Sequence, residues 1–256
     1  MSRMGKVIAI ANQKGGVGKT TTAINLGASL AIIGHRVLLI DTDPQGNTSS
    51  GIGVQKATVE QCIYDVLVGG IALSEVIRPS EIANLDVVPA TIQLAGAEIE
   101  LVSIMSRERR LEDALQAVKD SYDYIIIDCP PSLGIITLNA LTAADGLLIP
   151  VQCEFYALEG LAQLLNTVKL VQRHLNKTLV IEGVLLTMYD ARTNLGQQVV
   201  AEVQKYFGSQ VYQTVIPRNV RLSEAPSYGK PAVIFDVKSK GAQAYIELAK
   251  EVKANG

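Results

Sequence analysis

The sequence predicts an α/β protein with a doubly wound, mostly parallel sheet, and three observations support this fold class. Short aliphatic runs alternate with helical patterns along the chain, as strands and helices do in such folds. Hydrophobic residues make up 48% of the 256 residues and aromatic residues only 5%, so aliphatic side chains must fill the core. A glycine-rich loop directly follows the first aliphatic run. We therefore expect a ligand site at the carboxyl ends of the strands.

The predicted strands are aliphatic runs that end in turn or polar residues, a pattern typical of strands buried on both faces of a parallel sheet. In chain order they are residues 6–11, 36–41, 85–89, 124–128, 146–151 and 179–187. The predicted helices are residues 19–33, 107–120, 157–175 and 195–207. No linker rich in Pro or Ser, low-complexity tract or internal repeat divides the chain. We therefore expect residues 1–256 to form one domain.

Composition and charge exclude several classes of function. The apolar runs fall far short of the roughly 18 residues of a membrane-spanning helix, and no secretory signal is recognisable, so we expect a cytoplasmic protein. Cys62, Cys129 and Cys153 are too widely spaced for a typical metal motif. The net charge of −2 gives no overall attraction to nucleic acid. Residues 190–256, however, carry nine Lys or Arg against six Asp or Glu, so a polyanion surface would lie there.

The glycine-rich loop predicts a phosphate site. It reads Lys14-Gly15-Gly16-Val17-Gly18-Lys19-Thr20-Thr21, which matches the pattern G-x-x-x-x-G-K-[ST] except that Gln13 replaces the first glycine. The glycines let the backbone turn its N–H groups inward, and a helix N-terminus follows to receive phosphate. We expect Lys19 to neutralise the β- and γ-phosphates of a nucleotide, and the Thr20 hydroxyl to bind Mg²⁺.

Two further predicted strands end in carboxylates. Asp41 ends the second strand and Asp43 follows it, where a carboxylate can orient water in front of a γ-phosphate. The strand at 124–128 ends in Asp128, which is typical of a residue that holds the Mg²⁺ shell. Asp41 and Asp43 have an alternative role, since Asp often caps a turn.

The loop from Lys14 to Thr20 resembles the deviant Walker A motif of the ParA/MinD family of ATPases. Longer strings resemble its chromosomal, Soj-type branch, and the resemblance covers almost the whole chain. They are Asp41-x-Asp43-Pro-Gln-Gly-Asn, Ile-Asp128-Cys-Pro-Pro-Ser-Leu-Gly, Pro150-Val-Gln-Cys-Glu154-Phe-Tyr-Ala-Leu-Glu-Gly160 and Thr214-Val-Ile-Pro-Arg-Asn-Val-Arg221-Leu-Ser-Glu-Ala225-Pro.

The resemblance implies a P-loop NTPase fold of the deviant Walker A type, with ATP and Mg²⁺ as cofactors. It implies an ATP-dependent homodimer in which Lys14 reaches the partner's phosphates, and it makes Asp43 the water-activating residue that also faces the metal. Of the two roles, we expect Asp41 to support the groups around Mg²⁺ rather than to orient water. The family also suggests an adenine pocket, formed by Thr187, Met188, Pro217, Arg218 and Asn219.

The resemblance also implies partners. It implies binding to double-stranded DNA without sequence preference, and hence association with the nucleoid. It also implies that a ParB-type centromere-binding protein stimulates ATP hydrolysis and so releases the chain from DNA. Arg192, Arg218 and Arg221 are the candidate phosphate contacts, and Arg192 and Arg221 match positions that contact DNA in the family. The alternative for such residues is an ordinary solvated surface charge. We further expect slow hydrolysis, and a basic segment of the ParB-type partner acting on the acidic part of this chain, since residues 1–189 carry a net charge of −5. A role with a replication initiator stays open.

Three rival functions fit the residues less well. A MinD-type membrane anchor needs a C-terminal amphipathic helix with a basic face, whereas residues 241–256 resemble a helix packed on its own domain. An iron–sulfur carrier needs two suitably placed cysteines per subunit, and only Cys129 lies near a phosphate-side loop. No substrate pocket for a metabolic ligase is recognisable. The phosphate loop begins at Lys14, so we expect no N-terminal helix-turn-helix domain.

Overall fold

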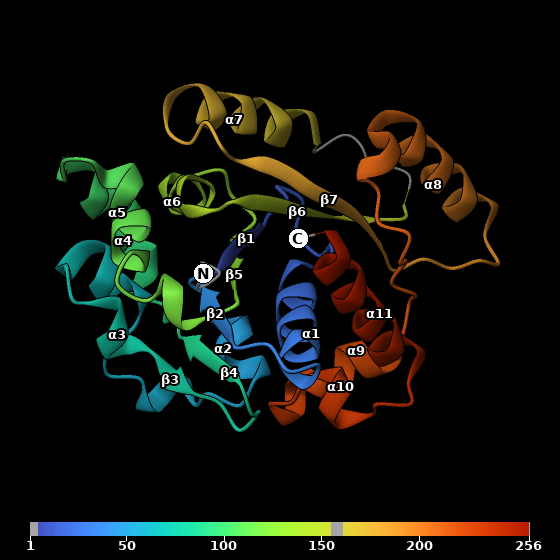
Figure 1. The fold of residues 1–256 in the computed structure, drawn as a ribbon, viewed down its shortest axis with the longest axis horizontal. Helices are drawn as coiled ribbons and strands as arrows, with labels where there is room; N and C mark the ends of the chain where they lie inside the picture. The colour runs from blue at the N-terminus through green and yellow to red at the C-terminus, as the bar shows by residue number, and fades with distance from the viewer. Residues whose placement is uncertain (1–4, 155–160, 256) are drawn as a thin grey trace.

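A computed structural model describes residues 5–154 and 161–255, and a seven-stranded sheet lies at its centre (Figure 1). The strand order is β3-β4-β2-β5-β1-β6-β7, and every neighbouring pair is parallel except β3 with β4. The strands are β1 (Lys6–Ile10), β2 (Val37–Asp41), β3 (Arg78–Pro79), β4 (Leu85–Val88), β5 (Tyr124–Asp128), β6 (Gly146–Gln152) and β7 (Val180–Thr187). The predicted doubly wound fold class is confirmed. The two-residue strand β3 was not predicted.

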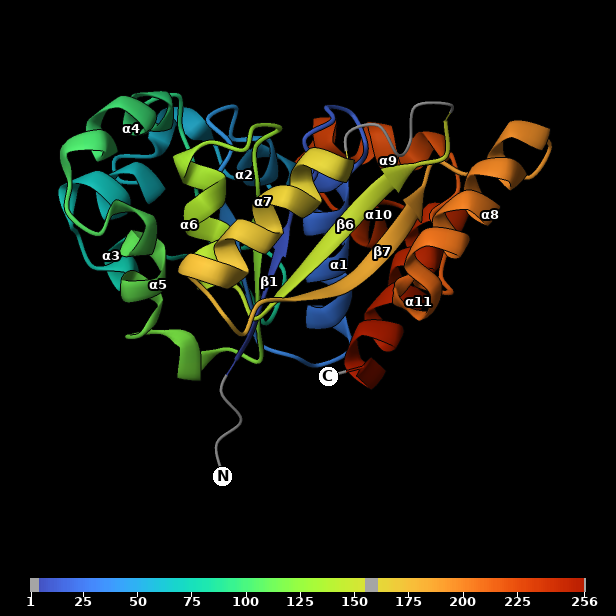
Figure 2. The same cartoon turned by 90° about the horizontal axis from the view of Figure 1, so that it is seen from above.

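Helices cover both faces of the sheet. Figures 1 and 2 show α7 and α8 over one side of β6 and β7, and α1 with α11 on the other side. One apolar layer includes α3 (Leu73–Val76), α4 (Leu94–Glu100), α5 (Arg110–Leu115), α6 (Ile135–Ala143), α7 (Leu161–His174) and α8 (Asn194–Phe207). The other includes α1 (Lys19–Ile32), α9 (Val220–Glu224), α10 (Ala232–Phe235) and α11 (Lys240–Asn255), with α2 (Asn47–Gly51) beside α1.

Alternation along β1 shows how one strand serves both layers. Val7 and Ala9 are buried in the layer that contains α6 and α7, whereas Ile8 and Ile10 are buried against α1. Successive side chains of a strand point to opposite faces, so a strand covered on both sides is apolar along most of its length. All five residues of β2 and of β5 are buried, and each strand is apolar except for the Asp at its carboxyl end.

The predicted helix at 107–120 is wrong in extent, because α5 spans only Arg110–Leu115 between short 3₁₀ turns. The buried side chain of Asn139 donates to the Arg107 carbonyl at 2.8 Å and accepts from the Leu111 amide at 3.1 Å. These bonds replace part of a helical ladder. The predicted helix at 157–175 corresponds to α7 from Leu161 onward. Residues 157–160 of the predicted helix, and residues 155–160 of the string from Pro150 to Gly160, lie outside the described residues.

The C-terminal helix packs on the domain, as expected from its sequence. Tyr245 of α11 is buried, and its hydroxyl shares a hydrogen bond of 3.0 Å with the Thr22 hydroxyl of α1. The amide of Ala232 donates to Asn25 Oδ1 of α1 at 2.8 Å. None of the helices in the described part of the chain has the length and apolar character needed to cross a membrane.

Candidate nucleotide-binding site

The glycine-rich loop joins β1 to α1 and has the backbone that its sequence predicts. Gly16 and Gly18 have φ values of 74° and 91°, in the left-handed region that glycine adopts without steric cost. Gly18 directly precedes α1, and the first turn of that helix carries no acidic side chain. The amides at this helix N-terminus can therefore receive an anion.

Both ends of the loop are fixed to neighbouring strands. Asn12 donates from Nδ2 to the Pro150 carbonyl of β6 at 2.7 Å, and its Oδ1 accepts from the Lys14 amide at 3.0 Å. At the other end, the Thr187 hydroxyl of β7 donates to the Val17 carbonyl at 2.8 Å. Sequence reasoning missed Asn12, although a polar residue immediately after a buried strand was a usable signal.

Lys19 is nearly buried, with 7% of its surface exposed, and its ammonium donates to the Lys14 carbonyl at 3.2 Å. Burial lowers the pKa of Lys19, while the nearby carboxylates of Asp128 and Asp43 oppose that shift. Within residues 5–154 and 161–255, the ammonium is thus held inside the loop by a single backbone carbonyl. A bound phosphate can replace that acceptor with a stronger, charged one.

Asp128 lies beside the start of α1 at the end of β5, fully buried. Its Oδ2 accepts from the Thr20 hydroxyl at 2.8 Å and from the Thr48 hydroxyl at 2.7 Å. Its Oδ1 is buried and has no hydrogen-bond partner among residues 5–154 and 161–255. Burial, and then the neighbouring charge of Asp41, raise the pKa of Asp128 to about 7. A buried carboxylate oxygen without a partner calls for a cation or a proton.

The oxygen atoms of Asp128 and Thr20 are suitable ligands for Mg²⁺. The unpartnered Asp128 oxygen and the Thr20 hydroxyl are hard oxygen ligands, which Mg²⁺ prefers. No group of three or more His, Cys, Asp or Glu within the described ranges could hold a metal by itself. A magnesium ion here would therefore take its other ligands from phosphate and water, as is usual for nucleotide sites.

Asp41 and Asp43 cap turns, the alternative that the sequence left open. Asp41 is fully buried opposite Asp128 in the β2–β5 pair, and accepts from the amide and hydroxyl of Ser49 at 2.8 and 2.7 Å. Burial raises the pKa of Asp41 to about 6, although the Ser49 hydrogen bonds oppose the shift. Asp43 is half-buried, and its Oδ1 accepts from the Gln45 amide at 2.9 Å. Within the described part of the chain its Oδ2 accepts no hydrogen bond, so this oxygen can accept one from a water molecule.

The segments expected to bind a base come together in one cavity of about 340 Å³ beside the loop. The amide of Tyr189 donates to the Ile216 carbonyl at 3.0 Å, which aligns the end of β7 with residues 216–219. Met188, in this turn, has a left-handed φ of 52°. The expected residues Thr187, Met188, Pro217, Arg218 and Asn219 all line the cavity, together with Gly18, Thr21, Ile216, Leu222, Ser223, Pro226 and Tyr245.

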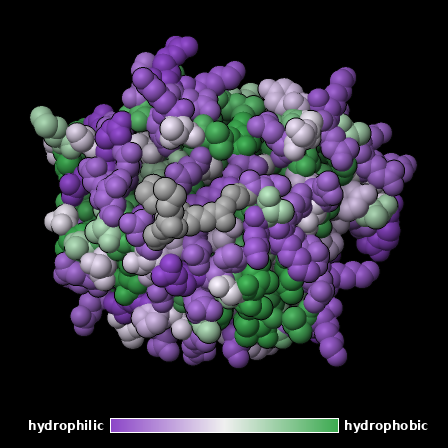
Figure 3. All heavy atoms as spheres, viewed as in Figure 1, coloured by the Kyte–Doolittle hydropathy of each residue, from purple (hydrophilic) through white to green (hydrophobic). Residues whose placement is uncertain are grey.

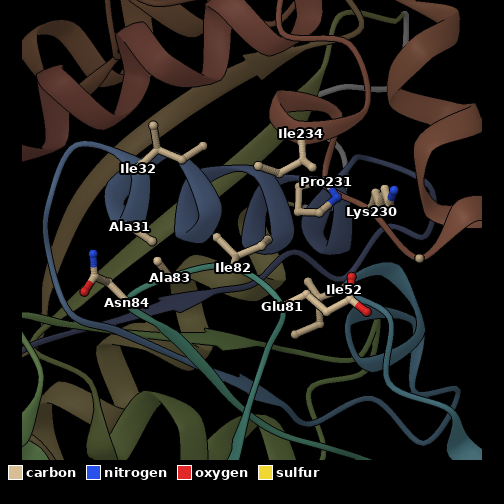
Figure 4. Close-up of a pocket in the computed structure, with 11 residues that line it drawn as sticks. Ala31, Ile32, Ile52, Glu81, Ile82, Ala83, Asn84, Lys230, Pro231 and Ile234 are labelled. Carbon is tan, nitrogen blue, oxygen red and sulfur yellow. The ribbon is translucent and has the colours of Figure 1, made fainter.

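A second cavity, of about 470 Å³, lies away from the loop and has different chemistry (Figure 4). Ile32, Ile82 and Ile234 supply apolar walls, and Glu81 and Lys230 are its charged residues. Figure 3 shows a largely hydrophilic face with a hydrophobic area over the region of α10. No residue of the phosphate loop lines this cavity, whereas Gly18 and Thr21 line the first one.

Within the described residues, the side chains of Lys14, Arg192, Arg218 and Arg221 make no hydrogen bond to Lys19, Thr20 or Asp128. The Lys14 ammonium has no hydrogen-bond or ion-pair partner within the described part of the chain, although its backbone is fixed. Arg192, Arg218 and Arg221 lie on the surface, with 88%, 62% and 51% of their side chains exposed. Each is ion-paired with a carboxylate of the same chain, which the sequence did not predict.

Known proteins are similar to this chain in sequence and in fold. The family model described as an AAA domain matches residues 5–181. Sporulation initiation inhibitor protein Soj of Bacillus subtilis is 70% identical over 253 residues, covering 99% of this chain and 100% of the Soj protein. This chain belongs to the Soj/ParA family. Within that family, chromosome partitioning protein ParA of Myxococcus xanthus is 56% identical over 97% of this chain and 88% of its own length. The family resemblance inferred from the sequence is confirmed.

A solved structure supports the same fold for this Soj/ParA chain. It is described as cobyrinic acid a,c-diamide synthase from Mycobacterium smegmatis with bound ADP and magnesium. That protein is 40% identical, with a TM-score of 0.85, and the match covers 96% of this chain and 93% of the other. Its name denotes a metabolic enzyme, whereas the full-length identity of 70% links this chain to Soj. The chain is a chromosome-partitioning ATPase of the Soj/ParA type.

Proposed function

We propose that this single-domain ATPase hydrolyses Mg-ATP between two copies of itself and binds DNA in that dimeric state. One observation carries the proposal: Lys19, Thr20 and the unpartnered Asp128 oxygen converge at the N-terminus of α1. An ammonium, a hydroxyl and a carboxylate at a helix N-terminus match the phosphate and magnesium chemistry of NTP hydrolysis. A related structure that holds ADP and magnesium is consistent with this assignment.

In the proposed reaction, Lys19 leaves the Lys14 carbonyl and contacts the β- and γ-phosphates. Thr20 and Asp128 hold Mg²⁺, which when bound neutralises charge on the phosphate oxygens. The adenine occupies the cavity at Met188, Pro217 and Asn219.

Asp43 orients the attacking water and accepts its hydrogen bond. Its half-buried position at the end of β2, on the same sheet edge as Asp128, supports this role. Its Oδ1 accepts from the Gln45 amide in this turn, and its second carboxylate oxygen can accept from the water. We infer slow basal hydrolysis, and acceleration by a partner that stabilises this turn.

Lys14 supplies the dimer contact. Its side chain has no partner within residues 5–154 and 161–255, although its backbone is held by Asn12 and Lys19. A fixed backbone with an unpartnered ammonium suits a residue that reaches another subunit's phosphates, as an arginine finger does.

The dimer would bind DNA through Arg192, Arg218 and Arg221. Guanidinium groups that bond phosphate oxygens give affinity without reading bases. Because log K falls with log salt with a slope of about −0.9Z, two copies of the surface double Z, the number of neutralised phosphates. ATP can thereby switch DNA affinity without altering a single DNA contact. A ParB-type protein, through a basic segment, would then stimulate hydrolysis and release the chain from the nucleoid.

The first experiment is binding of the intact chain to a random-sequence duplex with Mg-ATP and with Mg-ADP, each over a salt series. We expect tight, salt-sensitive binding with Mg-ATP alone. Absence of binding with either nucleotide would refute the DNA-binding part. ATPase rates with and without a ParB-type protein test the partner, and an unchanged rate would refute its role.

A further inference from the structure

All three arginines proposed to contact DNA are already occupied by carboxylates. Arg192 donates from Nε to Asp190 Oδ1 at 2.9 Å and from Nη2 to Asp190 Oδ2 at 2.7 Å. The pair is therefore bidentate, and it uses one whole edge of the guanidinium. Hydrogen bonds from Arg192 hold the pKa of Asp190 well below its usual range, so the carboxylate stays ionised.

Arg221 has two such partners from different parts of the chain. Its Nη1 donates to Glu224 Oε2 at 2.8 Å within α9, and its Nε lies 3.2 Å from Asp236 Oδ2, just after α10. Arg218 pairs with Glu154 at 3.2 Å. The three arginines thus face four carboxylates, and the net charge of the group is −1.

A DNA phosphate recognises a guanidinium with the same geometry as a carboxylate. Both accept two parallel N–H bonds from one edge of the fork. A phosphate that binds Arg192 through Nε and Nη2 must therefore displace Asp190. Exposed ion pairs are weak, so this displacement is possible but lowers DNA affinity.

We propose that Asp190, Glu224 and Asp236 are internal competitors of the DNA phosphates, which keep the affinity of one chain low and make stable DNA binding require two chains. The inference rests on the proposed DNA-binding function of Arg192 and Arg221. It assigns these carboxylates a regulatory role at the same surface.

The test compares Asp190→Asn with Glu112→Gln in the intact protein. Both variants remove one negative charge. Glu112 of α5 pairs with Arg109 at 2.6 Å, on the opposite side of the molecule from α8 and α9 (Figure 1). Dissociation constants for a random duplex with Mg-ATP are measured over a salt series. An exposed pair corresponds to a factor of about 1.4–5 in an equilibrium constant, so a dimer of Asp190→Asn should bind roughly 2- to 25-fold tighter. Glu112→Gln should match the wild type.

A double-mutant cycle separates competition from general repulsion. At low salt, where weak binding is measurable, Asp190→Asn should change the dissociation constant for DNA much less in an Arg192→Ala background than in the wild type. An undiminished effect would overturn direct competition. Equal binding by Asp190→Asn and Glu112→Gln, or weaker binding by Asp190→Asn, would refute the inference while leaving DNA binding intact. If the wild type itself bound no DNA with Mg-ATP, the proposed function would fail first. Thermal unfolding of each variant confirms that it is folded.

Discussion

Gly15→Val should separate ATP binding from dimerisation, because the position is open within one chain. The φ of Gly15 lies outside the left-handed region, and a Cβ added there meets nothing within 4 Å. Surface substitutions without strain change the free energy of unfolding by about 0.5 kcal/mol or less. Gly16→Val is the matched control, since Gly16 has a φ of 74°. A side chain there costs about 1–2 kcal/mol.

At roughly 2–4 °C per kcal/mol for a domain of this size, Gly16→Val should lower the melting temperature by about 2–8 °C. Gly15→Val should melt with the wild type, and Mg-ATP should still raise its melting temperature. Light scattering with Mg-ATP, in an Asp43→Ala background that prevents turnover, should then show a monomer. A Gly15→Val dimer would contradict an interface at this loop. Loss of the Mg-ATP shift would contradict the open space within the chain.

Four other substitutions test separate steps. Lys19→Ala removes the proposed phosphate contact, and calorimetry should show ATP affinity falling about 10- to 100-fold; unchanged affinity would remove Lys19 from the site. Asp43→Ala should keep ATP binding while kcat falls about 10²- to 10⁴-fold, as measured by phosphate release. Arg221→Ala should spare dimerisation and reduce the salt slope of DNA binding by about 1.8 for two copies; an unchanged slope would class it as an ordinary surface charge. Tyr245→Phe breaks the buried bond to Thr22 and should lower the free energy of unfolding by about 1 kcal/mol in urea titrations.

The phosphate site could be predicted from sequence because its determinants are local. Gly16, Gly18 and Lys19 lie within a few residues of one strand end, and their backbone conformations follow from residue type. Asp128 was found in the same way, as the polar end of an apolar strand. The surroundings of its carboxylate were not predictable, because the Thr48 hydroxyl that bonds Oδ2 comes from α2, while Oδ1 has no partner among the described residues.

Features that depend on distant side chains were missed or left open. The carboxylates around Arg221 come from α9 and from Asp236, and a sequence gives charges along a chain rather than distances between them. The balance counted over residues 190–256 therefore could not show which charges pair on this surface, nor that Glu154, from outside that range, pairs with Arg218. Helix α6 was missed for another reason: most of its nine residues are buried, so no polar face marks a helical period.

The contact between Tyr245 and Thr22 has a consequence for the order in which the protein assembles. The two residues are 223 positions apart, and α1 packs along α11. During synthesis the phosphate loop and α1 are made early, but α11, which packs against α1, is made much later. Until then the apolar side of α1 remains uncovered, a state that is prone to aggregation. Nascent chains should therefore depend on chaperones until α11 has been made, and a nucleotide-binding protein should form only after that point.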